Sequence, residues 1–115
     1  MSSGKIEYLM TYGTLRPSTT ATHKLPGYAM YNYGKYPYII RSPEHSVLGN
    51  LCAVTEAELA ELDVYEGVDR GLYTREIAAC TDLKTEKATL CYVYVATPTL
   101  HPERIESGDW YNRET

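Results

Sequence analysis

Glu66 is the residue of this sequence best placed for acid–base chemistry. Helical periodicity over Glu56 to Glu66 puts its side chain at about 340° on the wheel, close to Leu59 and Leu62 on the apolar face. A carboxylate there loses hydration and lies at the negative end of the helix dipole, and both effects raise its pKa. Such a group is a usable general base near neutral pH. The alternative is a last-turn glutamate that bends out into solvent.

A second segment that could contact a ligand is Tyr12-Gly13-Thr14-Leu15-Arg16, at the end of a predicted strand. Gly13 permits a sharp turn and a close approach of a ligand to the main chain. The amides after such a turn, with the Thr14 hydroxyl nearby, can form a small anion-binding nest. A carboxylate or an oxyanion would fit there. The alternative is a turn with no further role.

Two charged residues, Arg75 and Asp63, affect the prediction for Glu66. Tyr73 and Arg75 alternate with Thr74 and therefore face the same side of a predicted strand. If Arg75 lay beside Glu66 it would lower the pKa of that carboxylate, whereas a structural ion pair elsewhere is the other possibility. Asp63, one helical turn earlier, is the rival acid, or else a structural aspartate.

Local chemistry specifies both ends of the helix that carries Glu66. Thr55 and Glu58 form a capping box, which satisfies two backbone donors at the N-terminus, and Val54 and Leu59 make a hydrophobic staple. Gly67 supplies the left-handed residue that ends the helix. The predicted helix therefore spans Glu56 to Glu66.

The remaining chain is predicted to be mostly strand. The runs that alternate, or are apolar enough for strands, are Ile6–Tyr12, Tyr28–Tyr33, Tyr36–Arg41, Val47–Val54, Tyr73–Cys80 and Ala88–Thr97. Turns or loops are expected at 18–22, 42–45, 68–72 and 82–87, and a bulge or close backbone approach at Gly49. The segment from Pro98 to Thr115 should fold back over the sheet. This pattern predicts a single α+β domain over residues 1–115, built on a curled or closed sheet.

Composition excludes several classes of function. The net charge is −4 and there is no basic run, which argues against nucleic-acid and membrane partners. The 12 tyrosines suit half-buried strands. The three cysteines lie in separate apolar runs, as reduced buried thiols would, and the histidines show no metal-ligand spacing with them. With no signal peptide and no apolar run near 18 residues, a cytoplasmic protein is expected.

Four motifs occur in order and are more specific together than alone: Tyr-Gly-Thr-Leu-Arg at 12–16, Leu-Asp-Val-Tyr-Glu-Gly at 62–67, Tyr-Thr-Arg at 73–75 and Ile-Glu-Ser-Gly-Asp-Trp at 105–110. In these motifs the chain resembles the γ-glutamylcyclotransferase-like family, in its compact AIG2-like branch that includes γ-glutamylamine cyclotransferase. The resemblance covers Tyr8 to Trp110. It implies a small mixed β-barrel with one or two flanking helices and a cavity at one end.

The resemblance also implies an activity and a site. Glu66 matches the catalytic glutamate of the family, and Tyr12, Gly13, Thr14 and Leu15 match the loop that holds the α-carboxylate and amine of a γ-glutamyl group. Tyr73 is expected to bind substrate as well. The implied reaction is intramolecular aminolysis, in which the α-amine attacks the γ-carbonyl to release an amine and 5-oxoproline. No metal or cofactor is implied, and the partner is a small γ-glutamyl compound.

Two other functions fit the same residues. The cavity could capture a small amino-acid-like or anionic metabolite without turning it over, as a sequestering protein would. A lyase acting on a γ-glutamyl group attached to a biosynthetic intermediate or a protein lysine would share the chemistry and differ in its leaving group. The loop from Ser18 to Lys24 is not typical of the family and leaves the specificity open.

Overall fold

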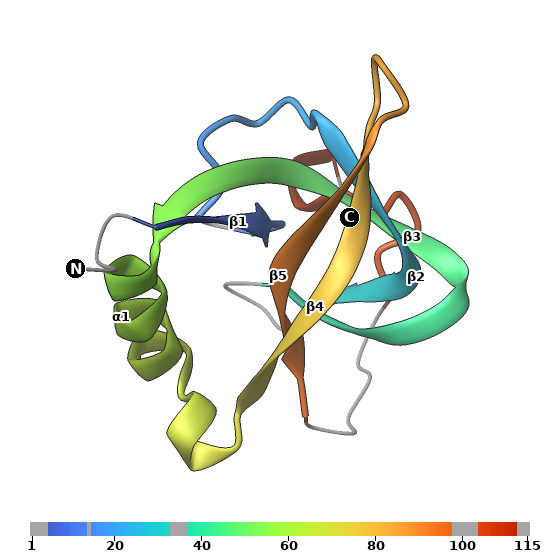
Figure 1. Cartoon of the computed structure of the whole chain (residues 1–115). Coiled ribbons are helices and arrows are strands. Elements are labelled where there is room, and N and C mark those ends of the chain that lie inside the picture. The colour runs from blue at the N-terminus through green and yellow to red at the C-terminus, as the bar shows by residue number, and fades with distance from the viewer. Residues whose placement is uncertain (1–4, 14, 33–36, 98–103, 113–115) are drawn as a thin grey trace.

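The computed structural model describes residues 5–13, 15–32, 37–97 and 104–112. Five strands form a closed barrel in the order β1-β3-β2-β4-β5 (Figure 1). They are β1 (Ile6–Thr11), β2 (His23–Asn32), β3 (Pro37–Thr55), β4 (Tyr73–Asp82) and β5 (Ala88–Ala96). One α-helix, α1 (Glu56–Glu66), and two 3₁₀ turns, η2 (Val68–Arg70) and η3 (Trp110–Asn112), complete the described elements. The predicted α+β class and the small mixed barrel are confirmed.

The long strand β3 holds the barrel together. Its first part pairs with β2 as far as Gly49, opposite His23, and its second part pairs with β1 from Asn50, opposite Thr11. Gly49 lies so close to β1 that a methyl group on it would overlap the carbonyl oxygen of Thr11, so the predicted close approach is confirmed. The barrel closes where β1 meets β5 in parallel, through the pair Leu9 and Tyr92.

The turn predicted at 42–45 is wrong, because β3 runs through these residues without a break. The pairing with β2 is nevertheless irregular there: Pro26 pairs with Ser46 and Tyr28 with Arg41, so residues 42–45 bulge opposite the single residue Gly27, which has a φ of 90°. A bulge of this kind lets a strand pair bend without ending it. The predicted start of β2 at Tyr28 is wrong for the same reason, since pairing with β3 extends the strand back to His23.

The helix has the predicted ends. The Thr55 hydroxyl accepts a hydrogen bond from the Glu58 amide at 3.1 Å, and the Glu58 carboxylate accepts one from the Thr55 amide at 2.8 Å. Gly67 ends the helix with a φ of 75°. The buried Leu59 packs the helix against Leu9 and Tyr94 on the outside of the barrel. These contacts place the last turn of α1 over the end of the barrel.

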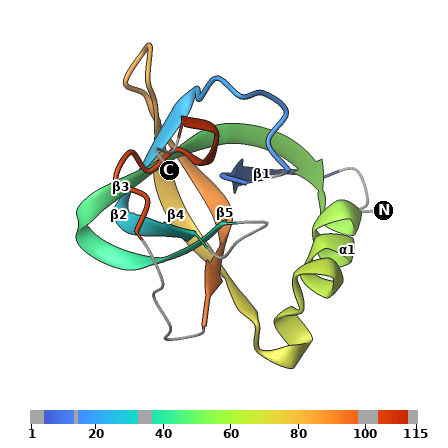
Figure 2. The ribbon, with the colours of Figure 1, turned by 180° about the vertical axis from the view of Figure 1, so that it is seen from behind.

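The alternation in β5 separates two apolar clusters. Val93 and Val95 point into the barrel, whereas Tyr92 and Tyr94 face outward beneath α1. The predicted return of the C-terminal segment is also confirmed for its described part: Ile105 and Trp110 are buried in the barrel core. Figure 2 shows this segment beside β2 and β3, where the Ile105 amide donates to Met30 and Gly108 accepts from Leu48.

Smaller predictions have mixed outcomes. The turn at 82–87 joins β4 to β5 as predicted, and Asp82 Oδ1 accepts from the amides of Lys84 and Thr85. The predicted loop at 68–72 contains η2. The three cysteines are free, Cys80 and Cys91 buried and Cys52 partly so. Within the described ranges, no helix is long and apolar enough to cross a membrane.

Candidate functional site

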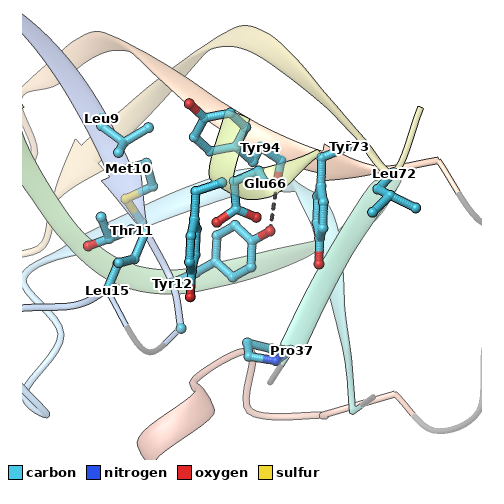
Figure 3. A pocket seen from close by; sticks show the side chains of 12 residues that line it. Leu9, Met10, Thr11, Tyr12, Leu15, Pro37, Glu66, Leu72, Tyr73 and Tyr94 are labelled. Carbon is cyan, nitrogen blue, oxygen red and sulfur yellow. Dashed lines mark hydrogen bonds between the residues drawn. The ribbon is translucent and has the colours of Figure 1, made fainter. Parts of the chain in front are cut away.

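A cavity of about 370 Å³ opens at one end of the barrel, where the turn after β1, the end of α1 and the start of β4 meet (Figure 3). Five of the six site residues predicted from the sequence line it: Tyr12, Gly13, Leu15, Glu66 and Tyr73. The sixth, Thr14, lies outside the described residues. The two segments singled out for their chemistry, 54 residues apart between Tyr12 and Glu66 in the numbering, therefore share one space.

Glu66 is half-buried, with its carboxylate among Tyr12, Tyr73 and Tyr94 (Figure 3). Burial raises the pKa of this carboxyl above its ordinary value of 4.5. The side chain lines the cavity, and the helix ends at the next residue, where the Gly67 amide donates to the carbonyls of Asp63 and Val64. The alternative of a glutamate bent out into solvent does not describe this structure.

Tyr12 and Tyr94 join the turn to the barrel wall. The Tyr12 hydroxyl donates to the main-chain carbonyl of Tyr94 at 2.7 Å. Burial raises the pKa of Tyr12 well above 10, and the neighbouring Tyr73 and Glu66 raise it further. Tyr12 is therefore a neutral hydrogen-bond donor that is already engaged, so its ring and the adjoining main chain are what it presents to the cavity.

Arg75 pairs with Asp63 and not with Glu66. Its guanidinium lies 3.5 Å from Asp63 Oδ2 and stands over the ring of Tyr92 at 4.7 Å. Asp63 Oδ1 also accepts a hydrogen bond from the Tyr94 hydroxyl at 2.8 Å. Asp63 and Arg75 line a separate cavity of about 230 Å³, on the side of Tyr92. Asp63 thus ties the helix to β4 and β5 through Arg75 and Tyr94.

A buried ion pair between Arg16 and Asp109 lies next to the Gly13 turn. The Arg16 amide donates to the Gly13 carbonyl at 3.1 Å, and Arg16 Nη1 donates to Asp109 Oδ1 at 2.6 Å. Arg16 Nε donates to Asn50 Oδ1 at 2.8 Å, and the guanidinium lies over the Tyr111 ring at 4.9 Å. The side chain of Arg16 is fully buried and that of Asp109 is 9% exposed.

Sequence reasoning missed several residues of the cavity. Leu9, Met10, Thr11, Pro37, Tyr65, Leu72 and Tyr94 line it as well. Tyr94 had a signal, since it alternates with Val93 and Val95 and so had to lie outside the barrel core. Pro37 had none, because its contact with Gly13 depends on how β3 returns: a methyl group on Gly13 would lie 2.9 Å from Pro37 Cγ. Gly13 must therefore be small for the turn to pack against β3.

The described residues include no cluster of three or more His, Cys, Asp or Glu side chains placed to hold a metal ion. Glu66 is the one carboxylate among the described residues that line the main cavity.

Comparisons with known proteins agree with the motifs. The family described as gamma-glutamyl cyclotransferase, AIG2-like, matches residues 9–112. The chain belongs to this family. A comparison with the curated proteins found no match.

Several solved structures have a similar fold. A solution structure of an Arabidopsis thaliana protein is 24% identical over 96% of this chain and 72% of that chain, with a TM-score of 0.70. A mouse AIG2-like protein is 18% identical over 95% of this chain and 97% of that chain, also with a TM-score of 0.70. A structure titled gamma-glutamyl cyclotransferase is 19% identical, covers 87% and 70% of the two chains and has a TM-score of 0.67. At these identities the likeness shows the fold.

Proposed function

We propose that this protein is a γ-glutamyl cyclotransferase that converts a small γ-glutamyl amine or amide into 5-oxoproline and a free amine, with Glu66 as general base and acid. One observation carries the proposal: a half-buried Glu66, with its pKa raised by burial, shares a cavity with the Tyr12-Gly13 turn. Family membership supports the reaction class.

The reaction needs one proton-transfer group and a curled substrate. The α-amine attacks the γ-carbonyl carbon, so a new C–N bond closes a five-membered ring while the original amide C–N bond breaks. Glu66 takes a proton from the attacking amine and returns one to the departing nitrogen, which leaves as a neutral amine. Because a single carboxylate can perform both transfers, no second acid is needed.

The cavity walls favour the curled conformation. We place the α-carboxylate and amine end of the substrate at the main chain of Gly13 and at Leu15, with the rings of Tyr12 and Tyr73 near Glu66. Holding two reacting groups of one molecule in contact removes much of the entropic barrier to cyclisation. Partial burial keeps the carboxylate poorly hydrated, and therefore basic enough to accept the proton.

The test is the substitution Glu66→Gln, with Glu61→Gln on the exposed side of the same helix as the matched control. Glu66→Gln should lower the rate of 5-oxoproline formation by about 10²-fold or more, the usual scale for a general acid–base group. Glu61→Gln should retain the rate. Each variant is incubated with a panel of γ-glutamyl amines and 5-oxoproline is measured; turnover retained by Glu66→Gln would refute the role of this residue.

The same assay separates an enzyme from a sequestering protein. Product in large molar excess over protein indicates catalysis. Stoichiometric retention of a γ-glutamyl compound without 5-oxoproline would show that the cavity only binds its ligand, and would overturn the proposal.

A further inference from the structure

The mouth of the cavity is apolar and exposed. Leu15 is 45% exposed, Leu72 46% and Tyr65 72%, and all three line the same cavity as Glu66. They come from three separate segments: the turn after β1, the residue before β4 and the last turn of α1. Apolar side chains gathered at the rim of a concave site are typical of a surface that a ligand covers.

Leu72 packs against the end of the helix that carries the proton-transfer group, on the far side of Tyr73 from Glu66 (Figure 3). Its amide donates to the Gly67 carbonyl at 3.1 Å, and a methyl group on Gly67 would lie 2.7 Å from Leu72 Cδ1. Leu72 is therefore packed on the residue that follows Glu66. In Figure 3, Leu72 and Tyr73 lie on one side of Glu66, while Leu15 and Met10 lie on the other.

This arrangement divides the cavity between the two halves of a substrate. If the glutamyl end occupies the Gly13 turn and the γ-carbonyl faces Glu66, the departing nitrogen and its substituent must extend beyond Glu66, toward Leu72. Among the residues that the structure describes, no Lys or Arg side chain lines the cavity. Arg75 is paired with Asp63 and Arg16 with Asp109, so neither offers a free charge there.

We infer that the leaving amine carries an uncharged, apolar substituent, aliphatic or arylalkyl, and that Leu72 is a specificity-determining residue that contacts it. This inference rests on the proposed cyclotransferase activity. The reaction is the same one: the γ-glutamyl amide of R–NH₂ gives 5-oxoproline and R–NH₂. Glu66 takes one proton from the α-amine and delivers one to the departing nitrogen.

The test compares four γ-glutamyl amides that differ only in the amine: 3-methylbutylamine, benzylamine, glycine and 1,4-diaminobutane. The two apolar substrates should have kcat/KM values roughly tenfold or more above the two charged ones, since small apolar groups in a pocket discriminate on that scale. Leu72→Asn should lower the apolar-to-charged ratio about tenfold, and Leu72→Met should keep it.

Two control variants test whether a change in the ratio comes from contact with Leu72 itself. Leu83, at the β4–β5 turn, is also 46% exposed, so Leu83→Asn makes the same change away from the cavity and should leave the ratio unaltered. Arg70 Nη2 reaches Gly67 without lining the cavity, so Arg70→Gln tests whether a nearby charge selects the substrate and should also leave the ratio unaltered.

The possible results are distinct. Equal or faster turnover of the glycine or diaminobutane amide, or a ratio that Leu72→Asn does not change, overturns the inference and leaves the cyclotransferase activity standing. A ratio that depends on Arg70 also overturns it. If none of the four amides yields 5-oxoproline, the proposed function fails, and this inference fails with it.

Discussion

Loss of the Asp109 carboxylate should destabilise the protein by about 3–5 kcal/mol, because it leaves the guanidinium of Arg16 buried without its counter-ion. Arg16 is fully buried at the side chain, and its Nη1 lies 2.6 Å from Asp109 Oδ1. The magnitude for Asp109→Ala belongs at the lower end of this range, since Arg16 Nε still donates to Asn50 and to the Ser18 carbonyl.

A double-mutant cycle separates the pair from its surroundings. Arg16→Met should cost a comparable amount, because it leaves the Asp109 carboxylate and Asn50 Oδ1 without their buried donor. Combining Arg16→Met with Asp109→Leu should cost clearly less than the sum of the two single changes, since replacing both charges by apolar groups removes the desolvation penalty. Coupling of this sign and size is what a buried ion pair requires.

The assay is urea unfolding followed by circular dichroism, with the free energy extrapolated to water and the slope compared between variants. A loss of 3–5 kcal/mol would be a large share of the stability of a small domain. If Asp109→Ala costs less than about 1 kcal/mol with an unchanged slope, the pair is not effectively desolvated and the reasoning is wrong. The Arg16 amide also holds the Gly13 carbonyl, so KM for γ-glutamyl substrates should rise in the same variants.

Three further changes have definite expected outcomes. Burial raises the pKa of Glu66 above 4.5, so the stability that its proton contributes is complete below pH 4.5 and is lost as the pH rises through the raised pKa. Across this range, urea midpoints should therefore show Glu66→Gln becoming more stable relative to the native protein as the pH rises. The activity of the native protein should fall as the pH is lowered through the same pKa. Tyr94→Phe removes the hydrogen bond to Asp63 but keeps the carbonyl that Tyr12 uses, and urea unfolding should show a loss of about 1.5–3 kcal/mol. Gly49→Ala should cost about 1–3 kcal/mol or more in the same assay, because the new methyl group overlaps the main chain of β1; a loss below about 1 kcal/mol would contradict this contact.

Features governed by nearby residues were predictable from the sequence. The helix was correct at both ends because its capping box, staple and terminal glycine all lie within 14 residues of one another, from Val54 to Gly67. Simple alternation in β5 puts Tyr92 and Tyr94 on one face of the strand and Val93 and Val95 on the other. The family and the shared cavity of Glu66 and Gly13 followed from motifs whose order is specific even though each alone is weak.

Features governed by distant pairing were not predictable. The residues at 42–45 have turn chemistry, but they form a bulge within β3 opposite Gly27, because β3 pairs with β2 on both sides of them. The sequence does not decide the partner of Arg75, because the choice between Asp63 and Glu66 depends on where the last two turns of α1 face. The pairing of Arg16 with Asp109 joins residues 93 apart, and no local pattern specifies it.

The return of residues 104–112 into the barrel has a consequence for synthesis on the ribosome. Ile105, Asp109 and Trp110 are made after all five strands, yet they complete the core and neutralise a charge placed there by the first turn. A ribosome adds roughly 5–20 residues per second, so the nascent barrel spends seconds with an unsatisfied guanidinium and an open apolar interior. Chaperone capture of the emerging chain should accordingly persist until this last segment has left the exit tunnel.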